Sequence, residues 1–218
     1  MNILLVRHGE TAWNRAGRYQ GRTDVPLSVD GEAQVGRLAA RLASVPIDVA
    51  VASPLSRARR TAEAVLAAPG RARPPELLLD DGLIEISHGG WESKLASEVE
   101  LSDAEMLHTW RHRPDREVPA GPGAETLGDV ELRAWSAMDR LAVKIGHGTA
   151  LVAAHDAVNR VILCKVLGLP LARVWTFQQA PAALNVLAGN TLETLQVVRL
   201  NDFDHVGPLL AHLVHQAL

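Results

Sequence analysis

The chain has 218 residues, of which 47% are hydrophobic and 22% are charged, and its formal net charge is −3. This length and composition are typical of a globular protein with one domain and a full hydrophobic core. The slightly negative charge argues against a general nucleic-acid-binding protein or a protein of anionic membrane surfaces, since both need a basic surplus.

A single cysteine, Cys164, excludes an intrachain disulfide and fits a reducing compartment. No segment approaches the roughly 20 uninterrupted apolar residues of a membrane-spanning helix. The N-terminal apolar run stops at Arg7, which makes it too short for the core of a signal peptide. We therefore expect a cytoplasmic protein that contacts neither a membrane nor nucleic acid.

Short apolar runs and amphipathic segments alternate along the chain. The runs predict buried strands, and the segments with apolar residues at helical spacing predict helices. The expected strands are 3–6, 48–53 and 149–154, followed by a hairpin of 183–188 and 193–200 around Gly189-Asn190. The expected helices are 28–42, 54–67, 125–145 and 156–167, with a further helix from about Pro208.

Three stretches lack a clear period. Residues 9–26 are rich in loop-forming residues, and residues 70–76 predict a turn before the apolar Leu77 to Leu79. From Trp91 to Gly123 the charge is scattered and proline and glycine accumulate. We expect a partly helical lid at approximately 91–124, inserted into a single domain that spans residues 1–218.

Strands that alternate with helices predict an α/β fold of three layers, in which a mostly parallel sheet carries helices on both faces. Ligands of such sheets bind at the carboxyl ends of the strands. Three junctions place polar residues there: Arg7-His8 after the first strand, Ser53 to Arg57 after the second, and His155 after the strand 149–154.

The residue types at these junctions are those of an oxyanion site. Arg7 and Arg57 would supply planar donors for a phosphate or carboxylate. Of the two imidazoles, His8 and His155, one in its neutral form could act as a nucleophile. Gly9 would let the backbone approach the anion without an intervening side chain.

A proton donor for a leaving group is also available. Glu85 follows a short apolar run in the stretch LIEISHGGWE and precedes a Gly-Gly turn. Its carboxyl group could therefore point into the same sheet edge and serve as a general acid.

Together these segments resemble the histidine phosphatase superfamily, whose fold is phosphoglycerate mutase-like, and within it the phosphatase branch. The matching segments, in chain order, are RHGET with Asn14, YQGRTDVPLSVDG (19–31), SPLSRARRTAE (53–63), IEISHGGWE (84–92) and LVAAHD (151–156). The three letters RHG alone would be a weak signal, but the ordered combination is specific.

The resemblance implies a role for each matching residue. His8 corresponds to the histidine that accepts the phosphoryl group, and Arg7, Arg57 and His155 to the groups that hold the phosphoryl oxygens. Glu85 corresponds to the acid that protonates the leaving oxygen and then, as a base, activates water. Cationic donors would neutralise the charge of the transition state, so that neither a metal ion nor another cofactor is required.

The substrate-binding residues implied by the resemblance lie around this centre. Asn14 corresponds to a secondary phosphate contact, and Gln20 and Gly21 to a loop that faces the substrate. Asp156 departs from the family, which usually has glycine after the second histidine. A carboxylate beside a phosphate would be unfavourable, so we expect Asp156 to cap the helix that it begins and to face away from the anion.

The resemblance favours a phosphatase that moves a phosphoryl group from a small phosphorylated metabolite to His8 and then to water. A cofactor-dependent phosphoglycerate mutase would use the same site, but such mutases have longer chains with more tyrosine and lysine after the Glu85 motif. The alternative of another class is a catalytically inactive phosphate-binding interaction module. The loss of the nucleophile, an arginine or the acid would mark such a module, and His8, Arg57 and Glu85 are all present.

Other candidate residues are less informative. His108 and His112 have the i,i+4 spacing of a zinc-binding pair but lack a third ligand of clear spacing, so we expect them on the lid surface. Trp110, Arg111 and Arg113 either contact the non-phosphate part of a substrate or belong to that surface. An edge strand or the C-terminal helix would permit a homodimer, although nothing in the sequence requires one.

Overall fold

The computed structural model describes residues 1–71 and 73–207. Within them, one sheet has the strand order β3-β2-β4-β1-β5-β6. Its strands are β1 (Asn2–Arg7), β2 (Val49–Ala52), β3 (Leu77–Leu79), β4 (Thr149–Ala154), β5 (Leu184–Ala188) and β6 (Gln196–Asp202). Strands β1 to β4 pair in parallel, while β5 and β6 run antiparallel at one edge. The helix expected from Pro208 lies outside the described residues.

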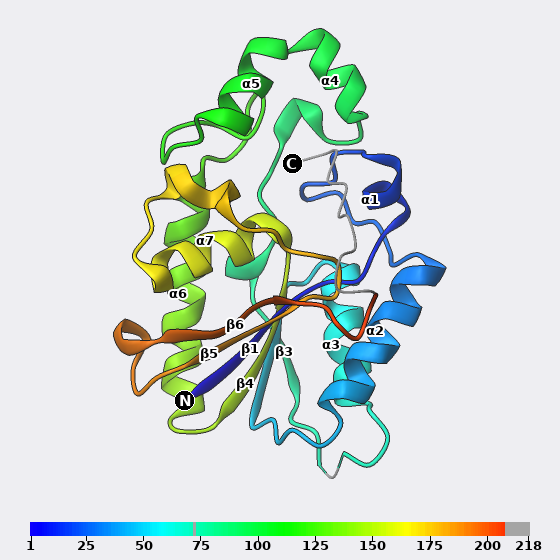
Figure 1. The fold of residues 1–218 in the computed structure, drawn as a ribbon, viewed down its shortest axis with the longest axis vertical. Coiled ribbons are helices and arrows are strands. Elements are labelled where there is room, and N and C mark those ends of the chain that lie inside the picture. The colour runs from blue at the N-terminus through cyan, green and yellow to red at the C-terminus, as the bar shows by residue number, and fades with distance from the viewer. Residues whose placement is uncertain (72, 208–218) are drawn as a thin grey trace.

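Helices cover both faces of the sheet (Figure 1). Helices α2 (Val29–Leu42) and α3 (Ser56–Leu66) pack on one face, and α6 (Leu127–Ile145) and α7 (Asp156–Leu167) pack on the other. Figure 1 shows α1 (Ala12–Ala16), α4 (Ala96–Ser102) and α5 (Ala104–His112) at the end toward which the parallel strands run. The expected three-layer α/β fold with a mostly parallel sheet and a short, partly helical lid is confirmed.

The remaining regular elements are short 3-10 turns: η1 (Asp81–Leu83), η2 (Gly89–Trp91), η3 (Leu171–Thr176) and η4 (Leu192–Thr194).

In residues 1–71 and 73–207, no helix combines the length and the apolar character that crossing a membrane requires.

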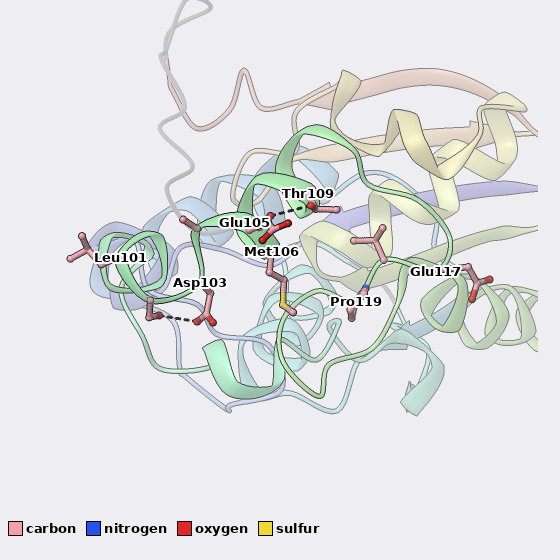
Figure 2. Close-up of a pocket in the computed structure, with 10 residues that line it drawn as sticks. Leu101, Asp103, Glu105, Met106, Thr109, Glu117 and Pro119 are labelled. Carbon is pink, nitrogen blue, oxygen red and sulfur yellow. Dashed lines mark hydrogen bonds between the residues drawn. The ribbon is translucent and has the colours of Figure 1, made fainter.

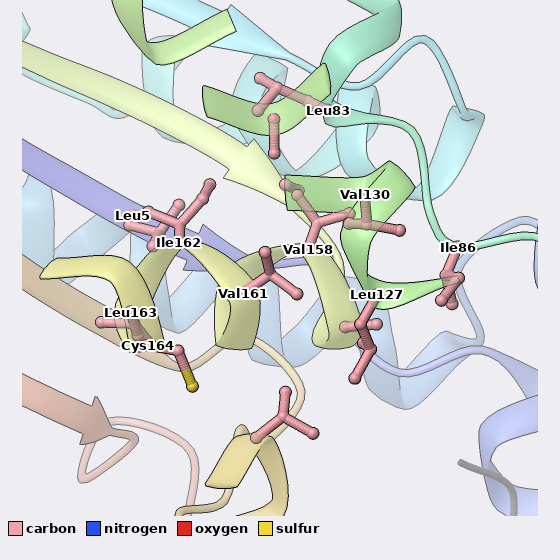
Figure 3. Close-up of a cluster of buried hydrophobic side chains, with 14 of the residues drawn as sticks. Leu5, Leu83, Ile86, Leu127, Val130, Val158, Val161, Ile162, Leu163 and Cys164 are labelled. Carbon is pink, nitrogen blue, oxygen red and sulfur yellow. The ribbon is translucent and has the colours of Figure 1, made fainter. Parts of the chain in front are cut away.

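The two cores follow from the period of two in β1, which lies between β4 and β5. Ile3 and Leu5 face α6 and α7, whereas Leu4 and Val6 face α2 and α3. Figure 3 shows Leu5 among buried side chains of α7 and α6. Because both faces of β1 are covered, its apolar run is uninterrupted until Arg7, where the strand leaves the core.

The segment 9–26, predicted as a loop, contains the short helix α1. Thr11 and Asn14 form its capping box: the Thr11 hydroxyl accepts from the Asn14 N–H at 3.1 Å, and Asn14 Oδ1 accepts from the Thr11 N–H at 3.0 Å. Gly17 ends the helix with a φ of 64°. A helix of five residues shows no apolar period, and only its cap is visible in the sequence.

Helix α3 begins at Ser56 rather than at the expected Pro54. Its first turn is capped from a distant loop, because Asp24 Oδ1 accepts hydrogen bonds from the Ser56 N–H at 2.8 Å and from the Ser56 hydroxyl at 2.7 Å. A cap that lies 32 residues away leaves no local signal, so the sequence could not show this start.

The connection between the two strands of the C-terminal hairpin is longer than expected, and both strands are shorter. β5 ends at Ala188, and β6 begins at Gln196 and continues to Asp202, so the connection is not a turn at Gly189-Asn190 alone. The 3-10 turn η4 fills the loop, where the Thr194 hydroxyl accepts from the N–H groups of Asn190 and Thr191. Threonine side chains can hydrogen-bond to the backbone of their own loop. Such bonds compete with strand pairing, so the second strand begins later in the chain.

Two glycines of α2 provide a matched test of how closely this helix packs against the chain at Glu10. A Cβ at Gly31 would overlap the Glu10 carbonyl oxygen, whereas a Cβ at Gly36 would meet no atom within 4 Å. We expect Gly31→Ala to destabilise the fold by about 1–3 kcal/mol through overpacking. Gly36→Ala should stabilise it by about 0.5–1 kcal/mol, since alanine is the better helix former. Urea unfolding of both variants measures this, and equal effects of the same sign would contradict the close approach of α2 to Glu10.

Candidate active site

The last residues of β1 are held from both sides at the carboxyl edge of the sheet. The His8 N–H donates to the Ala154 carbonyl at 3.1 Å, and the His8 carbonyl accepts from the Ala182 N–H at 3.0 Å. The Arg7 N–H donates to the Ala183 carbonyl at 3.1 Å. Both side chains are 2% exposed, so the sheet places a cationic group and an imidazole in a nearly water-free position.

The structure gives a packing reason for Gly9, and its expected role in the approach of an anion stays a prediction. A Cβ at Gly9 would lie 2.7 Å from both the Gly31 carbonyl oxygen and Val35 Cγ2. Real side chains do not tolerate such contacts. The glycine therefore lets α2 pack against the chain directly after His8, and this packing fixes the loop that follows the nucleophile candidate.

The contacts of His8 identify which ring nitrogen is available. His8 Nδ1 lies 2.7 Å from the Gly9 carbonyl oxygen, which can only accept, so Nδ1 carries the proton in the neutral ring. Nε2 then keeps its lone pair. Burial, reinforced by the positive charges of Arg57 and Arg7, holds the pKa of His8 well below its ordinary value. The ring is therefore neutral and nucleophilic at Nε2 at physiological pH.

His155 lies beside His8, with 5.1 Å between the ring centroids and an interplanar angle of 61°. Its Nε2 is 2.8 Å from the Ser53 hydroxyl, which itself accepts from the Leu55 N–H. The hydroxyl can donate to Nε2 while it accepts from Leu55, and in that tautomer the ring proton lies on Nδ1, which is then a donor. Burial and the charge of Arg57 lower the pKa of His155 well below its usual value.

Arg57 reaches the site from the first turn of α3. Its Nη1 donates to the Thr23 carbonyl at 2.9 Å and its Nη2 to the Gly21 carbonyl at 2.8 Å. Burial lowers the pKa of Arg57 to about 10, which leaves the guanidinium charged at physiological pH. Backbone carbonyls therefore orient this arginine without neutralising its charge.

Glu85 lies 6% exposed between core residues. Leu83 and Ile86, which flank it, pack into the core beside Leu127 and Val130 (Figure 3). Glu85 Oε1 accepts from the Ile86 N–H at 2.8 Å, and Oε2 lies 3.4 Å from the Ala157 N–H. Burial raises the pKa of Glu85, which favours the protonated form that a general acid needs.

The structure brings most of the predicted residues to one small pocket. Its lining consists of Arg7, His8, Asn14, Gln20, Gly21, Arg57, Glu85 and His88. Asn14 reaches it from α1, and Gln20 is oriented by a hydrogen bond from the Thr11 hydroxyl to its Oε1 at 2.8 Å. Sequence reasoning placed all of these residues in the site except His88.

His88 is a buried residue that the sequence analysis did not single out. Its Nδ1 lies 2.8 Å from the Ala120 carbonyl oxygen, which places a proton on Nδ1 and a lone pair on Nε2. Its ring packs edge-on against Tyr19 and Trp110, with centroid separations of 4.9 and 6.1 Å. The sequence feature that could have indicated His88 was its position three residues after Glu85 in the same loop.

The expected helix cap at Asp156 is wrong. His155 is the N-cap residue of α7, and Asp156 is its first helical residue. Its carboxylate is 1% exposed and forms ion pairs with Arg7, at 2.9 Å, and with Arg160.

Three buried donors of the site have no hydrogen-bond partner among residues 1–71 and 73–207: Arg7 Nε, Arg57 Nε and His155 Nδ1. A buried donor without a partner costs about 1–3 kcal/mol. An anion with several oxygens would satisfy all three at once, and the tetrahedral phosphoryl group has that form. The arrangement therefore suits a phosphoryl group held next to His8 Nε2.

A wider hollow of about 710 Å³ lies on the lid segment (Figure 2). Asp103, Glu105 and Glu117 line it together with apolar side chains such as Met106. These carboxylates would repel a phosphate, so this hollow is not the phosphate site. In the same segment, the ring centroids of His108 and His112 lie 4.6 Å apart, and the described residues offer no group of three or more metal-ligating side chains.

A sheet edge with a neutral imidazole, two oriented arginines and a buried carboxyl group is an arrangement that suits phosphoryl transfer. The comparison with known proteins narrows this class. Residues 3–202 match the histidine phosphatase superfamily (branch 1), so the chain belongs to this family. The resemblance seen in the motifs is thereby confirmed, and the chain is a phosphatase, a phosphoric monoester hydrolase.

Its relatives include enzymes that are named for different substrates. The chain is 30% identical over 218 residues to phosphoserine phosphatase 1 of Hydrogenobacter thermophilus, covering 100% of both chains. It is 32% identical to the adenosylcobalamin/alpha-ribazole phosphatase of Salmonella typhimurium, covering 82% of this chain and 85% of the relative. It is 31% identical to a probable phosphoglycerate mutase of Serratia proteamaculans, covering 78% and 76%. Among solved structures, Bacillus stearothermophilus YhfR superposes with a TM-score of 0.86 at 28% identity, covering 94% and 99%.

The lowered pKa values of the buried histidines predict how stability depends on pH. Below about pH 6.5 the histidines of the unfolded chain bind protons, whereas His8 and His155 of the folded chain stay neutral. The free energy of unfolding therefore falls as the pH falls through this window, by no more than about 1.4 kcal/mol per pH unit for each ring. In phosphate-free buffer, the thermal midpoint should be lower at pH 5.5 than at pH 7.5.

The variant His8→Gln should show a shallower pH dependence of the thermal midpoint than the unsubstituted protein. Glu85 has the opposite effect on the pH dependence of stability, because its raised pKa adds stability at low pH that is lost as the pH rises. The variant Glu85→Gln therefore serves as the second control. An identical pH dependence in the protein with and without His8 would contradict a neutral, buried His8.

Proposed function

We propose that the chain is a metal-independent phosphatase that hydrolyses small phosphomonoesters through a phosphohistidine at His8. The observation that carries this proposal is the neutral His8 ring, whose Nδ1 is bound to the Gly9 carbonyl and whose Nε2 lone pair lies beside two arginines. Neutrality and orientation are what a nitrogen nucleophile needs.

The reaction has two steps. In the first, His8 Nε2 forms a bond to phosphorus as the bond from phosphorus to the leaving oxygen breaks, and Glu85 donates its proton to that oxygen. In the second, a water oxygen bonds to phosphorus as the phosphorus–nitrogen bond breaks, and the Glu85 carboxylate takes a proton from the water. His8 returns to its neutral form, and inorganic phosphate leaves.

Arg7, Arg57 and His155 supply the electrostatic part of catalysis. The transition state spreads charge over three equatorial oxygens, and fixed donors stabilise that charge without reorganising. The three unpartnered buried donors of these side chains support the assignment. Asn14 and Gln20, which line the same pocket, are proposed to contact the bound ester.

The substrate is proposed to be a small phosphorylated metabolite. A relative that spans the whole chain is named as a phosphoserine phosphatase, so phosphoserine is the first ester to assay, followed by sugar phosphates and ribazole phosphate. His88, which lines the pocket, and the lid segment are the parts that would distinguish these esters. We propose a cytoplasmic location, and a homodimer remains a prediction.

A second candidate, phosphoglycerate mutation, is favoured by the relative named as a probable phosphoglycerate mutase. A mutase must return the phosphoryl group of His8 to a bound sugar acid before water attacks. Interconversion of 3- and 2-phosphoglycerate, measured with and without the bisphosphate, distinguishes the two reactions. The inactive phosphate-binding module would bind phosphate and show neither reaction.

The phosphohistidine route predicts activity without added metal. Protein treated with EDTA should hydrolyse an aryl phosphate and form an acid-labile phosphoenzyme. His8→Ala should lower kcat by at least about 10³-fold, because the nucleophile is lost. His147→Ala, at an exposed histidine before β4, is the matched control and should retain full activity.

Radiolabelled phosphoenzyme trapped by rapid mixing measures the intermediate directly. Loss of turnover in EDTA, or an undiminished phosphoenzyme in His8→Ala, would refute the mechanism.

The general-acid role of Glu85 predicts a dependence on the leaving group. An alkyl oxygen is a poor leaving group and needs a proton, whereas an aryl oxygen leaves as the anion. Glu85→Gln should therefore lower kcat/KM by about 10²–10³-fold for phosphoserine and by less than about 10-fold for an aryl phosphate. The ratio of the two losses is the measurement, and equal losses would argue that Glu85 has only a structural role.

A further inference from the structure

Asp156 lies at a junction between the active site and the rest of the fold. As the first residue of α7 it places a fully buried carboxylate between two guanidinium groups, with Oδ2 at 2.9 Å from Arg7 Nη1 and Oδ1 on Arg160 Nε.

Arg160 is anchored independently of the pocket. Its Nη1 donates to the carbonyls of Val174, at 3.2 Å, and Phe177. Its guanidinium lies over the Trp175 ring, 5.1 Å from the centroid. These contacts with η3 and the residue that follows it fix Arg160, and Arg160 in turn fixes one oxygen of Asp156.

The two ends of the Arg7 guanidinium differ in their contacts. Nη1 is occupied by Asp156 and by the Gln179 carbonyl. Gln179 is itself held by Asn185 through hydrogen bonds of 2.8 and 3.0 Å. Arg7 Nε is buried and finds no partner in the described part of the chain. The protein thus holds Arg7 by one end and leaves the other for a phosphoryl oxygen.

We propose that Asp156 is a positioning residue, which orients Arg7 so that its Nε edge meets the phosphoryl group. The inference rests on the proposed function, because it deepens the role given there to Arg7. Asp156 pairs with both Arg7 and the rigidly held Arg160 and so fixes the position of Arg7. A guanidinium held in this way loses less conformational freedom when it binds an oxyanion.

The same carboxylate also acts on the general acid. The charged groups that face Glu85 are Asp156, Arg57 and Arg7, and among them Asp156 alone favours the protonated acid. Burial is the first cause of the raised pKa of Glu85, and the negative charge of Asp156 adds to it. Removing that charge should narrow the pH range over which Glu85 holds its proton.

A purely structural role for Asp156 would be to neutralise Arg160, and the two roles can be separated. Asp156→Asn leaves both arginines without their partner, so it should lower stability as well as activity. The double variant Asp156→Asn/Arg160→Met removes the unpaired Arg160 charge as well. It should recover part of the thermal midpoint but none of the activity if Asp156 positions Arg7.

The experiment measures kcat/KM for an aryl phosphate and the Kd for inorganic phosphate by calorimetry. The aryl ester does not need the general acid, so its loss reports on Arg7 rather than on Glu85. We expect kcat/KM to fall by about 10–100-fold in both variants, which is the loss that a small displacement of a catalytic group causes. The Kd for phosphate should rise by about 10-fold or more in both variants, a loss comparable to that of one charge-assisted hydrogen bond.

The pH profile adds a measurement that a structural role would not change. With phosphoserine, the fall of kcat/KM on the alkaline side should begin at lower pH in the double variant than in the unsubstituted protein. Asp139→Asn, at an exposed carboxylate of α6, is the control and should change none of these quantities.

Activity of the double variant within twofold of the unsubstituted protein, with an unchanged pH profile, would overturn the proposal. The double variant decides the question even if Asp156→Asn fails to fold. The calorimetric Kd needs no turnover, so a protein that binds phosphate without hydrolysing esters would refute the proposed function and still test Asp156.

Discussion

The structure depends on keeping positive charge buried at the carboxyl end of β1. Arg7 and Arg57 are almost completely removed from water, and each would be costly there without compensation. Arg57 is compensated by backbone carbonyls, which are dipoles rather than charges. Its charge is therefore left for a ligand, and the nearby imidazoles are driven into their neutral forms.

Burial and this charge together act on the neighbouring groups. Burial, and after it the charge of the two arginines beside His8, lowers the pKa of His8 and disfavours an imidazolium, so the ring that is proposed to attack phosphorus is kept neutral. Glu85 lies in the same buried region, but desolvation outweighs the attraction of the arginines and its pKa is raised. The same environment thus disfavours the imidazolium form of His8 and favours the protonated form of Glu85 in one pocket, a combination that suits phosphoryl transfer to a histidine.

Two carboxylates outside the pocket connect the loops that build it. Glu92 accepts hydrogen bonds from the Arg22 N–H at 3.2 Å, the Thr23 hydroxyl at 3.0 Å and the His88 N–H at 3.2 Å. Glu125 accepts from Arg133, which donates to the carbonyls before Glu85. The loop whose carbonyls orient Arg57 is therefore tied to the loop that carries Glu85, the proposed general acid. At Gly21, where φ is 51°, a side chain would overlap the Glu92 carboxylate, which explains the glycine there.

The sequence by itself determined the fold class, the order of the principal strands and helices, and most of the residues that line the pocket, because apolar period and the ends of strands are local signals. It did not show the cap of α3 by Asp24, the packing reason for Gly9, or the place of His88. Each of these depends on atoms distant in the chain. Asp156 is the clearest case: its sequence position predicted a helix cap, and only the tertiary structure, by placing Arg7 and Arg160 on either side of it, decided that its carboxylate pairs with them instead. A buried charge is satisfied by the nearest opposite charge in space, and spatial proximity is a property of the fold rather than of the local sequence.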